Sequence, residues 1–497
     1  MNLHAFPVLL SALLAAQSPD VANFDFTAGT LAGWDGEGFT LEVANGKDPK
    51  EAYSVTSKER DALGGKALLH RAFIVPADAG VIRFRACAIR DKSCPANENL
   101  DVLLLGAGKR ILPKRVRLEN GWKEAGLLPA QDGQPREYIW PVAAHAGKWL
   151  RIVVLDEDAR AGCYLQCGGF QVQTQEEFEA AEFGADLQGV ASRYKLPTLV
   201  PYESEHFLAM SNAEEGFSNS RLKLCETQYR LFYDHFRRKN LTLYSPRSRL
   251  QVSMFDSQAG FEAYLGRKMS ADIIGIYQPA SNRLVMYDFA RNDAFVARKQ
   301  EALRKSQKIF LQMDRLQYLD DLDRRAREAR ADANTATIMH EVAHQLSFNC
   351  GMLNRQADVP SWLAEGLACY CEATANGSWQ GIGEIDPPRV WSLAETIRAK
   401  QKLMSLKELL ETDHWARTTD VKLALLGYAQ SWALFRMLIE EQPHRLGAYL
   451  KLIYSERVAE RRLANFQQAF GSDLTGLEAR YTAYVKNIVE QHAPRKR

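Results

Sequence analysis

The sequence predicts a multidomain protein in which a β-sandwich precedes an α+β domain with a mainly helical C-terminal lobe. Residues 20–173 form short alternating runs separated by Gly, Asp, Asn and Pro, a pattern typical of strands and turns. Residues 199–332 mix strand-like and helix-like runs, and residues 333–497 carry apolar side chains at helical spacing. The length of 497 residues and the 46% hydrophobic content allow two or three domains with substantial cores.

The first 17 residues are typical of a signal peptide. Phe6–Gln17 is an apolar run that ends in small residues and is too short to span a membrane. Only His4 precedes it, so the usual basic segment is absent, and a buried first strand or a frayed terminus is the alternative. We expect cleavage near Ala16–Ser18, a secreted or periplasmic protein, and no membrane-spanning helix elsewhere in the chain.

Six strands are expected in the sandwich. They are Lys66–Val75, Gly80–Ala88, Leu100–Leu105, Arg136–Pro141, Trp149–Asp156 and Cys163–Val172. The opening segment Phe24–Trp34 and the closing segment Gly169–Val172 resemble galactose-binding-like jelly rolls, modules that bind sugars, cell surfaces or other protein domains. A glycan or cell-surface ligand is therefore one expectation for this domain. Its four tryptophans would either stack on sugar rings or fill the core: Trp34, Trp122, Trp140 and Trp149.

An acidic, helix-like linker is expected over residues 174–198, ending near Pro197, and an α/β segment follows over residues 199–332. In that segment we expect strands at His206–Ser211 and Leu250–Asp256, a helix at Glu214–Arg238, and two strands within Ile274–Asp288 around the turn Pro279–Asn282. Residues 291–332 are densely charged and predict one long, solvent-exposed helix.

The segment Ile338–Leu346 contains the motif H-E-x-x-H. Residues four apart lie one turn apart on the same face of a helix, so His340 and His344 can reach one metal ion. Glu341 lies beside them, where it can accept a proton. The alternative is a chance pair of surface histidines.

A second motif supplies the ligand that two histidines leave missing. Catalytic zinc takes three protein ligands and keeps one position open for water. Glu365 follows His344 by 21 positions, which leaves room for the first helix to stop near Gly351 and a second to start at Pro360. Since the neighbours of Glu365 are apolar, a solvated helix carboxylate is the weaker interpretation. We expect one zinc ion per chain, bound by His340, His344 and Glu365.

These motifs resemble those of the gluzincin metallopeptidases, in which the third zinc ligand is a glutamate. The W-L-x-E-G-x-A-x-Y string from Trp362 to Tyr370 is closest to the aminopeptidase-type branch, and the longer strings resemble uncharacterised bacterial gluzincin-like domains, over roughly residues 200–490. The resemblance implies a zinc-dependent peptidase that acts on proteins or peptides. The metzincin pattern does not fit, because it needs Gly and His where Ser347 and Cys350 stand.

The resemblance extends to Leu426–Leu438, which is similar to the helix that carries the catalytic tyrosine of aminopeptidase-type gluzincins. It implies that Tyr428 donates a hydrogen bond to the developing oxyanion; the alternative is a core aromatic residue. Ile274–Asp288, however, lacks the G-x-M-E-N exopeptidase signature. An endopeptidase is therefore predicted, with an aminopeptidase as the alternative. The second strand of this segment is expected to be the cleft-edge strand that pairs with an extended peptide.

The mechanism that follows assigns a role to each residue. Zinc lowers the pKa of its water, and Glu341 takes the water's proton and passes it to the leaving amine. Tyr428 helps to stabilise the oxyanion. His414 is a second candidate donor, although a surface histidine is the favoured interpretation.

Eight cysteines, an even number, fit an oxidising compartment. The first four admit three pairings, of which Cys87–Cys94 is favoured, with Cys163 and Cys167 as the other two residues. A bridge from Cys350 to Cys369 or Cys371 would join the two ligand-bearing helices; the alternative is buried free thiols.

The net charge of +2 and the lack of a basic patch interleaved with aromatic residues exclude nucleic acid as the expected partner. A different class of function also stays open. The chain could be a non-catalytic glycan- or surface-binding protein that keeps a degenerate peptidase domain as a scaffold. The complete ligand set argues against that alternative, because a scaffold does not need Glu341.

Overall fold

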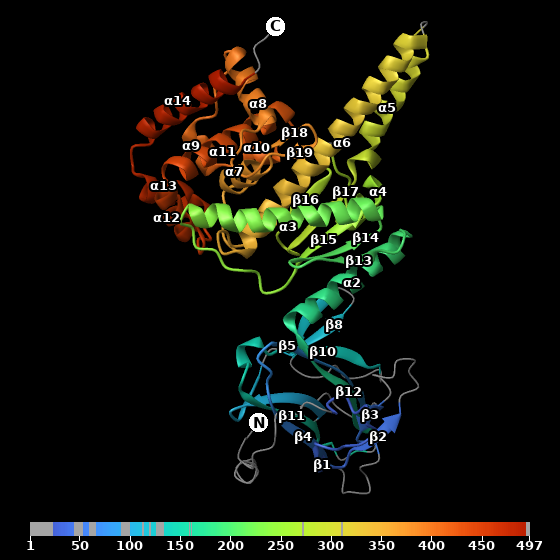
Figure 1. Cartoon of the computed structure of the whole chain (residues 1–497). Coiled ribbons are helices and arrows are strands. Elements are labelled where there is room, and N and C mark those ends of the chain that lie inside the picture. The colour runs from blue at the N-terminus through green and yellow to red at the C-terminus, as the bar shows by residue number, and fades with distance from the viewer. Residues whose placement is uncertain are drawn as a thin grey trace. The chain divides into compact units, whose positions relative to one another are not determined.

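A computed structural model shows two compact units, residues 1–181 and 182–497 (Figure 1). It describes residues 23–43, 53–58, 66–90, 100–111, 114–118, 121–125, 134–158, 160, 162–270, 273–309 and 312–493. The predicted signal peptide lies outside them. Among the described residues, no helix combines the length and the apolar character that crossing a membrane requires.

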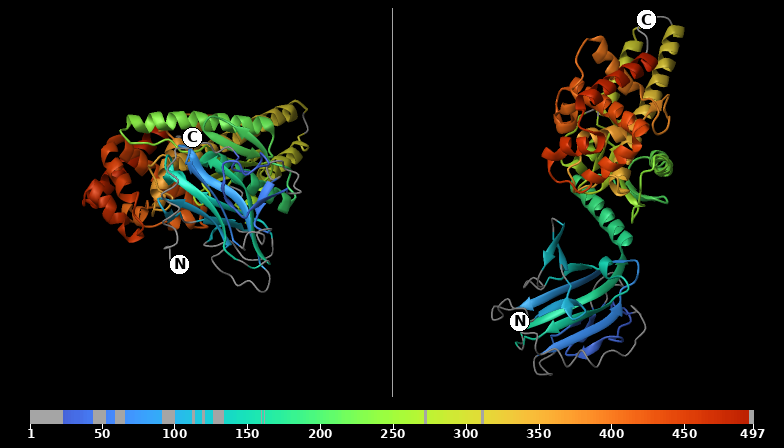
Figure 2. Two further views of the ribbon diagram at one scale, coloured as in Figure 1. Left: turned by 90° about the horizontal axis from the view of Figure 1, so that it is seen from below. Right: turned by 90° about the vertical axis from the view of Figure 1, so that its left-hand side faces the viewer.

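Unit 1 contains two antiparallel sheets that share one core, so the N-terminal part is sandwich-like, as expected (Figure 2). One sheet has the order β1-β4-β11-β6-β7 and the other β2-β3-β12-β5-β10-β8-β9. The strands are β1 Asp35–Glu37, β2 Thr40–Val43, β3 Tyr53–Thr56, β4 Ala67–Ile74, β5 Ala79–Arg90, β6 Leu100–Gly106, β7 Lys109–Arg110, β8 Lys114–Leu118, β9 Gly121–Ala125, β10 Arg136–Pro141, β11 Trp149–Asp156 and β12 Cys163–Thr174, with a short 3-10 turn at Ala143–His145. All six predicted strands are confirmed.

Aromatic rings fill the centre of the sandwich. Phe84 stacks on Trp140 at 4.3 Å and on Phe170 at 5.1 Å between ring centroids. Trp34 is also buried, so two of the four tryptophans belong to the core. Trp149 differs from them because it is 49% exposed at the start of β11.

The favoured pairing of Cys87 with Cys94 is wrong, because Cys87 lies outside any disulfide. Its Sγ lies 3.8 Å from Gln166 Oε1 of β12. Cys163 is disulfide-bonded, and Cys94 lies outside the described residues. The staple between the ligand-bearing helices is wrong too, since its three members are separate buried thiols: Cys350, Cys369 and Cys371.

The expected linker segment forms a single helix, α2 Gln175–Tyr194, and the division between the two units falls within it. Unit 2 then opens with a five-stranded sheet of order β13-β14-β15-β17-β16. Its strands are β13 Val200–Glu203, β14 Phe207–Ser211, β15 Leu250–Phe255, β16 Gly275–Gln278 and β17 Arg283–Tyr287. Strands β14, β15 and β17 are parallel, while β13 and β16 are antiparallel to their neighbours.

The prediction that the second strand of Ile274–Asp288 is the edge strand is wrong. β17 lies inside the sheet between β15 and β16, so the first strand of the pair, β16, is the edge. The expected turn does separate the two strands, with Asn282 in the left-handed region at φ +58°. The chain therefore first forms the edge strand β16 and then turns to form the inner strand β17.

The first helices of unit 2 pack on this sheet, and the later ones build the C-terminal lobe. They are α3 Glu215–Arg238, α4 Gln258–Leu265, α5 Asp293–Ser306, α6 Gln312–Asn349, α7 Ser361–Cys371, α8 Pro387–Arg398, α9 Leu406–Glu411, α10 His414–Arg417, α11 Val421–Glu441, α12 Pro443–Ile453, α13 Arg462–Phe470 and α14 Leu474–His492. Short 3-10 turns lie at Phe289–Arg291 and Ala459–Arg461, and a small hairpin of β18 Thr374–Ala375 and β19 Ser378–Trp379 follows α7. The C-terminal region is thus mainly helical, as expected.

The charged segment 291–332 forms two helices rather than one. α5 packs against the first part of α6, and Lys299 Nζ lies 3.4 Å from Asp323 Oδ1 between them (Figure 1). α6 then continues for 38 residues into the H-E-x-x-H motif. The helix is continuous because Gln312–Asn349 contains neither Gly nor Pro.

The close approach of α7 to α11 depends on Gly366. A Cβ atom at this position would lie 2.5 Å from the Ser431 carbonyl oxygen, so any larger residue must push the two helices apart. The surrounding core leaves little room for this movement, since Trp362 and Trp432 are fully buried beside the contact.

We predict that Gly366→Ala lowers the free energy of unfolding by about 1–3 kcal/mol, the usual cost of overpacking a core. Gly189→Ala on α2 is the matched control, because a Cβ there meets no atom within 4 Å. The control should be stabilising by about 0.5–1 kcal/mol, since Ala favours a helix over Gly. Thermal unfolding of both variants measures the difference, and equal stability would contradict the role of Gly366.

Candidate metal centre

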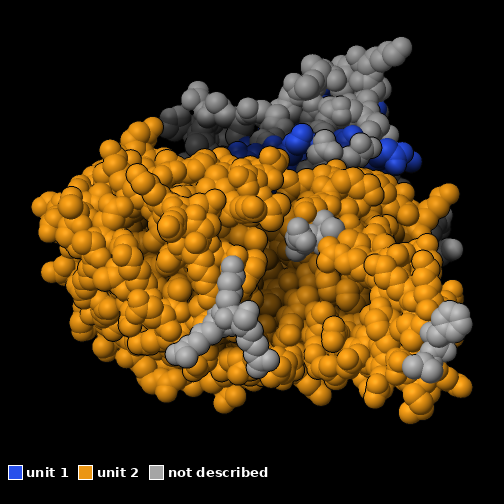
Figure 3. Space-filling view, turned by 90° about the horizontal axis from the view of Figure 1, so that it is seen from above, with its two compact units in different colours: residues 1–181 blue, residues 182–497 orange. Residues whose placement is uncertain are grey.

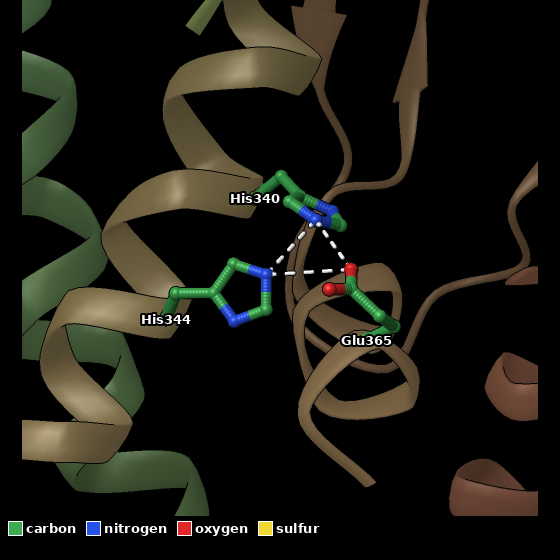
Figure 4. Close-up of side chains that lie close together, drawn as sticks. All are labelled: His340, His344 and Glu365. Atoms are coloured by element: carbon green, nitrogen blue, oxygen red, sulfur yellow. Dashed lines mark hydrogen bonds and ion pairs between the residues drawn. The ribbon is translucent and has the colours of Figure 1, made fainter. Parts of the chain in front are cut away.

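Three predicted ligands from two helices converge on one point (Figure 4). His340 and His344 project from α6, and Glu365 projects from α7. His340 Nε2 lies 3.1 Å from His344 Nε2 and 3.1 Å from Glu365 Oε2, and His344 Nε2 lies 3.4 Å from the same oxygen. The structure therefore brings together all three residues that the motif spacing selected.

These separations fit a tetrahedral zinc site. Zn–N and Zn–O bonds of about 2.0–2.2 Å place neighbouring ligand atoms of a tetrahedron roughly 3.3 Å apart. The three observed distances, 3.1, 3.1 and 3.4 Å, bracket that value. The triangle of ligand atoms thus matches what a small divalent cation requires.

Glu372 orients His340 toward the other two candidate ligands. Its Oε2 lies 2.5 Å from His340 Nδ1, which donates its proton to the carboxylate. His340 Nε2 is then directed at Glu365 Oε2. Burial lowers the pKa of His340, but Glu372 and Glu365 raise it well above its usual value, so a proton or a cation can bridge the two atoms.

Sequence analysis missed Glu372 and its partner Arg389. Arg389 of α8 donates from Nε at 2.9 Å and from Nη2 at 2.5 Å to Glu372 Oε1, and Asp386 lies 3.7 Å from Arg389. Burial favours the neutral acid, but Arg389 and His340 hold the pKa of the Glu372 carboxyl well below its usual range. No local motif marks Glu372, because its partners come from α6 and α8.

A second group of possible ligands is less suitable. His340, Cys369 and Glu372 also lie close together, but His340 Nδ1 and Glu372 Oε2 already hydrogen-bond to each other at 2.5 Å. Arg389 already supplies the positive charge beside Glu372. The His340–His344–Glu365 group is therefore the better candidate.

The local sequence explains why the ligands meet. The buried face of α6 includes Ile338, Met339 and Val342, which pack into the core and leave the histidines on the adjoining face. α6 ends at Asn349, Gly351 adopts φ +88° just beyond it, and Pro360 precedes α7. The expected helix–loop–helix arrangement of the ligands is confirmed.

Glu341 is held by the edge strand of the sheet. Its Oε2 accepts a hydrogen bond of 2.6 Å from the backbone N–H of Tyr277 on β16. This contact fixes the carboxylate between the ligand helix and the sheet edge. The space-filling view shows that the surface of unit 2 is hollowed on one face (Figure 3).

Tyr428 lies at the centre, on α11. The centroid of its ring is 6.4 Å from that of His340. The guanidinium carbon of Arg389, which also pairs with Glu372, lies 5.3 Å from the Tyr428 centroid. The Glu365 carboxylate, followed by burial, raises the pKa of Tyr428, so its hydroxyl keeps the proton that an oxyanion donor needs. His414 instead lies exposed at the start of α10, where its ring contacts Thr412 at 2.8 Å and Glu408 at 3.3 Å.

Comparison with known proteins gives one family match. A model described as "Protein of unknown function (DUF1570)" matches residues 334–459, less than half of the chain but including His340, His344, Glu365 and Tyr428. A search of curated proteins finds no match.

Two solved structures illustrate the structural likenesses. TmCBM61 in complex with beta-1,4-galactotriose shares 13% identity, with a TM-score of 0.21, over 32% of this chain and 100% of that one. The M60 catalytic domain with the CBM51-1 and CBM51-2 domains from Clostridium perfringens ZmpB shares 10% identity, with a TM-score of 0.27, over 85% of this chain and 41% of that one. Scores this low carry no argument about fold or function.

We predict that Glu372→Gln weakens zinc binding by about 10-fold or more, because the amide is a poorer acceptor for His340 Nδ1–H. Glu395→Gln on α8 is the control, since Glu395 is exposed and pairs only with Arg398 among the ion pairs of the described residues. Competition with a chromogenic chelator gives both affinities, and circular dichroism confirms folding. Equal affinities in the two variants would remove Glu372 from the centre.

Proposed function

We propose that this protein is a zinc-dependent metallopeptidase of the gluzincin type, exported from the cell. The observation that carries the proposal is the convergence of His340, His344 and Glu365 within 3.4 Å, with Glu341 adjacent on the same helix. A complete ligand triangle beside an oriented carboxylate is what metal-assisted hydrolysis requires. Export rests on the signal-like first 17 residues.

Each residue has a defined task in this proposal. His340, His344 and Glu365 would hold the zinc ion, which would supply a Lewis acid that lowers the pKa of water. Glu341 accepts the proton of the attacking water and delivers it to the leaving amine. The Tyr277 N–H keeps the Glu341 carboxylate oriented for both transfers. Tyr428 donates a hydrogen bond to the oxygen of the scissile carbonyl as negative charge develops on it.

The edge strand β16 favours an endopeptidase. In the register with β17, Ile274 and Ile276 bond inward, so the backbone groups of Gly275 and the Tyr277 carbonyl point away from the sheet, while the outward Tyr277 N–H is already bonded to Glu341. An extended peptide can add there as a further strand, with its chain continuing in both directions past Glu341. The chain lacks the acidic G-x-M-E-N segment that would anchor a free amino terminus, and an aminopeptidase is therefore the less favoured reading.

A second candidate function is glycan or cell-surface binding by unit 1. The exposed ring of Trp149 favours it, because a solvent-facing indole offers a flat surface on which a sugar ring can stack. In the non-catalytic form of this candidate, the metal centre would serve only as a scaffold. Glu341 argues for catalysis instead, since its carboxylate lies beside the two histidines without belonging to the ligand triangle.

The sharpest test is Glu341→Gln. We predict that the variant binds one zinc per chain, as the wild type does, and loses at least about 100-fold in the rate of hydrolysis of an unfolded protein such as casein, because the amide cannot accept the proton. Glu328→Gln on an exposed part of α6 is the control and should keep full activity. Metal analysis and a fluorescent-casein assay provide the two readouts.

The outcomes separate the candidates. Full activity in Glu341→Gln would refute the mechanism. A wild-type protein that binds one zinc and hydrolyses no unfolded protein would support the binding candidate, which glycan-array binding by wild type but not Trp149→Ala would then establish. Hydrolysis confined to peptides with a free amino terminus would identify an aminopeptidase, whereas equal cleavage of amino-blocked peptides would identify an endopeptidase.

A further inference from the structure

A cavity of about 380 Å³ lies between the start of α3 and the middle of α6, apart from the metal centre. It has an unusual concentration of positive charge. Its lining side chains include three arginines and one carboxylate: Arg221, Arg327, Arg330 and Glu214. The volume lies within the range of small-molecule sites, and the polar lining suits a charged ligand.

Arg221 is more buried than Arg327, which is exposed. Its Nη1 is buried and has no hydrogen-bond partner among the described residues. Its remaining contacts are weak, with Nε 3.4 Å from Ser220 Oγ and the guanidinium 5.5 Å from the Phe217 ring centroid. A buried guanidinium nitrogen without an acceptor is costly, so this position calls for an oxygen from outside the chain.

The nearby carboxylate cannot provide that oxygen. Asp288 Oδ1 already accepts from Ala290 N at 2.9 Å, Asn334 Nδ2 at 2.8 Å and Arg330 Nε at 3.1 Å. Asp288 Oδ2 is taken by Arg330 Nη2. Since Arg330 and its neighbours use the acceptor capacity of Asp288, no carboxylate of the described residues is hydrogen-bonded to Arg221.

Two further features add positive potential at the same place. Arg327 lines the cavity from α6, and no ion pair of this residue occurs in the described part of the chain. The 24-residue helix α3 begins at the cavity, and its N-cap residue Glu214 makes no side-chain capping bond. The backbone N–H groups of that first turn therefore remain available to an acceptor.

We propose that this cavity binds an anion with at least two oxygen atoms, a carboxylate or phosphate group of a small ligand. Arg221 and Arg327 line it from two different helices, and a guanidinium group pairs with such an anion through two parallel N–H bonds. Bound there, the ligand joins the start of α3 to α6, six residues before His340. The proposal does not depend on zinc, because none of the cavity residues belongs to the metal centre.

The test measures binding of inorganic phosphate and of malonate to the full chain by isothermal titration calorimetry, at constant ionic strength. We predict saturable binding of at least one of the two anions. Arg221→Gln and Arg327→Gln should each weaken that binding at least tenfold. Arg325→Gln is the control, since Arg325 lies on the same helix, is 73% exposed and pairs with Asp321 outside the cavity.

Arg327 is exposed, so its replacement tests the site even if Arg221→Gln fails to fold. Binding of phosphate alone identifies a phosphorylated ligand, and binding of malonate alone identifies a carboxylate. The proposal is overturned if neither anion binds, or if Arg327→Gln binds as tightly as Arg325→Gln. The second of these results would place any measured binding elsewhere, including at the metal centre, and would leave the proposed peptidase activity untouched.

Discussion

The acceptor atoms of His340, His344 and Glu365 face one another within 3.4 Å, and unit 2 is built to keep them there. Without a metal ion, a proton on His340 can bridge to Glu365, because burial lowers the pKa of His340 but Glu372 and Glu365 raise it well above its usual value. The packing must still hold the two helices at this distance. α7 contributes by lying against α11 at Gly366, where no side chain separates the backbones. A bound metal ion would take the place of that proton.

The buried charges next to the candidate ligands also help to hold these ligands in place. Glu372 and Arg389 are both largely buried, and removing either one would leave the other as a costly unpaired buried charge. Together they fix the orientation of His340 through Nδ1 and direct its Nε2 at the other two candidate ligands. Arg389 also faces the Tyr428 ring, so one side chain supports both the ligand and the candidate oxyanion donor. Ion pairs of this kind orient groups more than they stabilise a fold.

Local patterns accounted for much of the structure. Alternation of apolar and polar residues located the six predicted strands, because that pattern depends on residues close in sequence. The i, i+4 spacing of the histidines, together with Glu365, selected the candidate ligands, because helix geometry fixes that spacing. The failures involve distant partners. Glu372 is meaningful only beside Arg389, β16 is an edge only because β17 pairs with β15, and a cysteine pairing depends on where strands end. One further failure was the break that makes α5 and α6 two helices.

The unbroken length of α6 makes it a lever. Roughly 40 Å of rigid helix separate Gln312 from His340. The core buries the motif end of α6 and leaves the Gln312 end exposed, so the helix pivots near its motif end. A tilt of one degree about that end moves Gln312 by roughly 0.7 Å. Displacement of the α5–α6 projection is therefore reduced along the helix before it reaches the histidines.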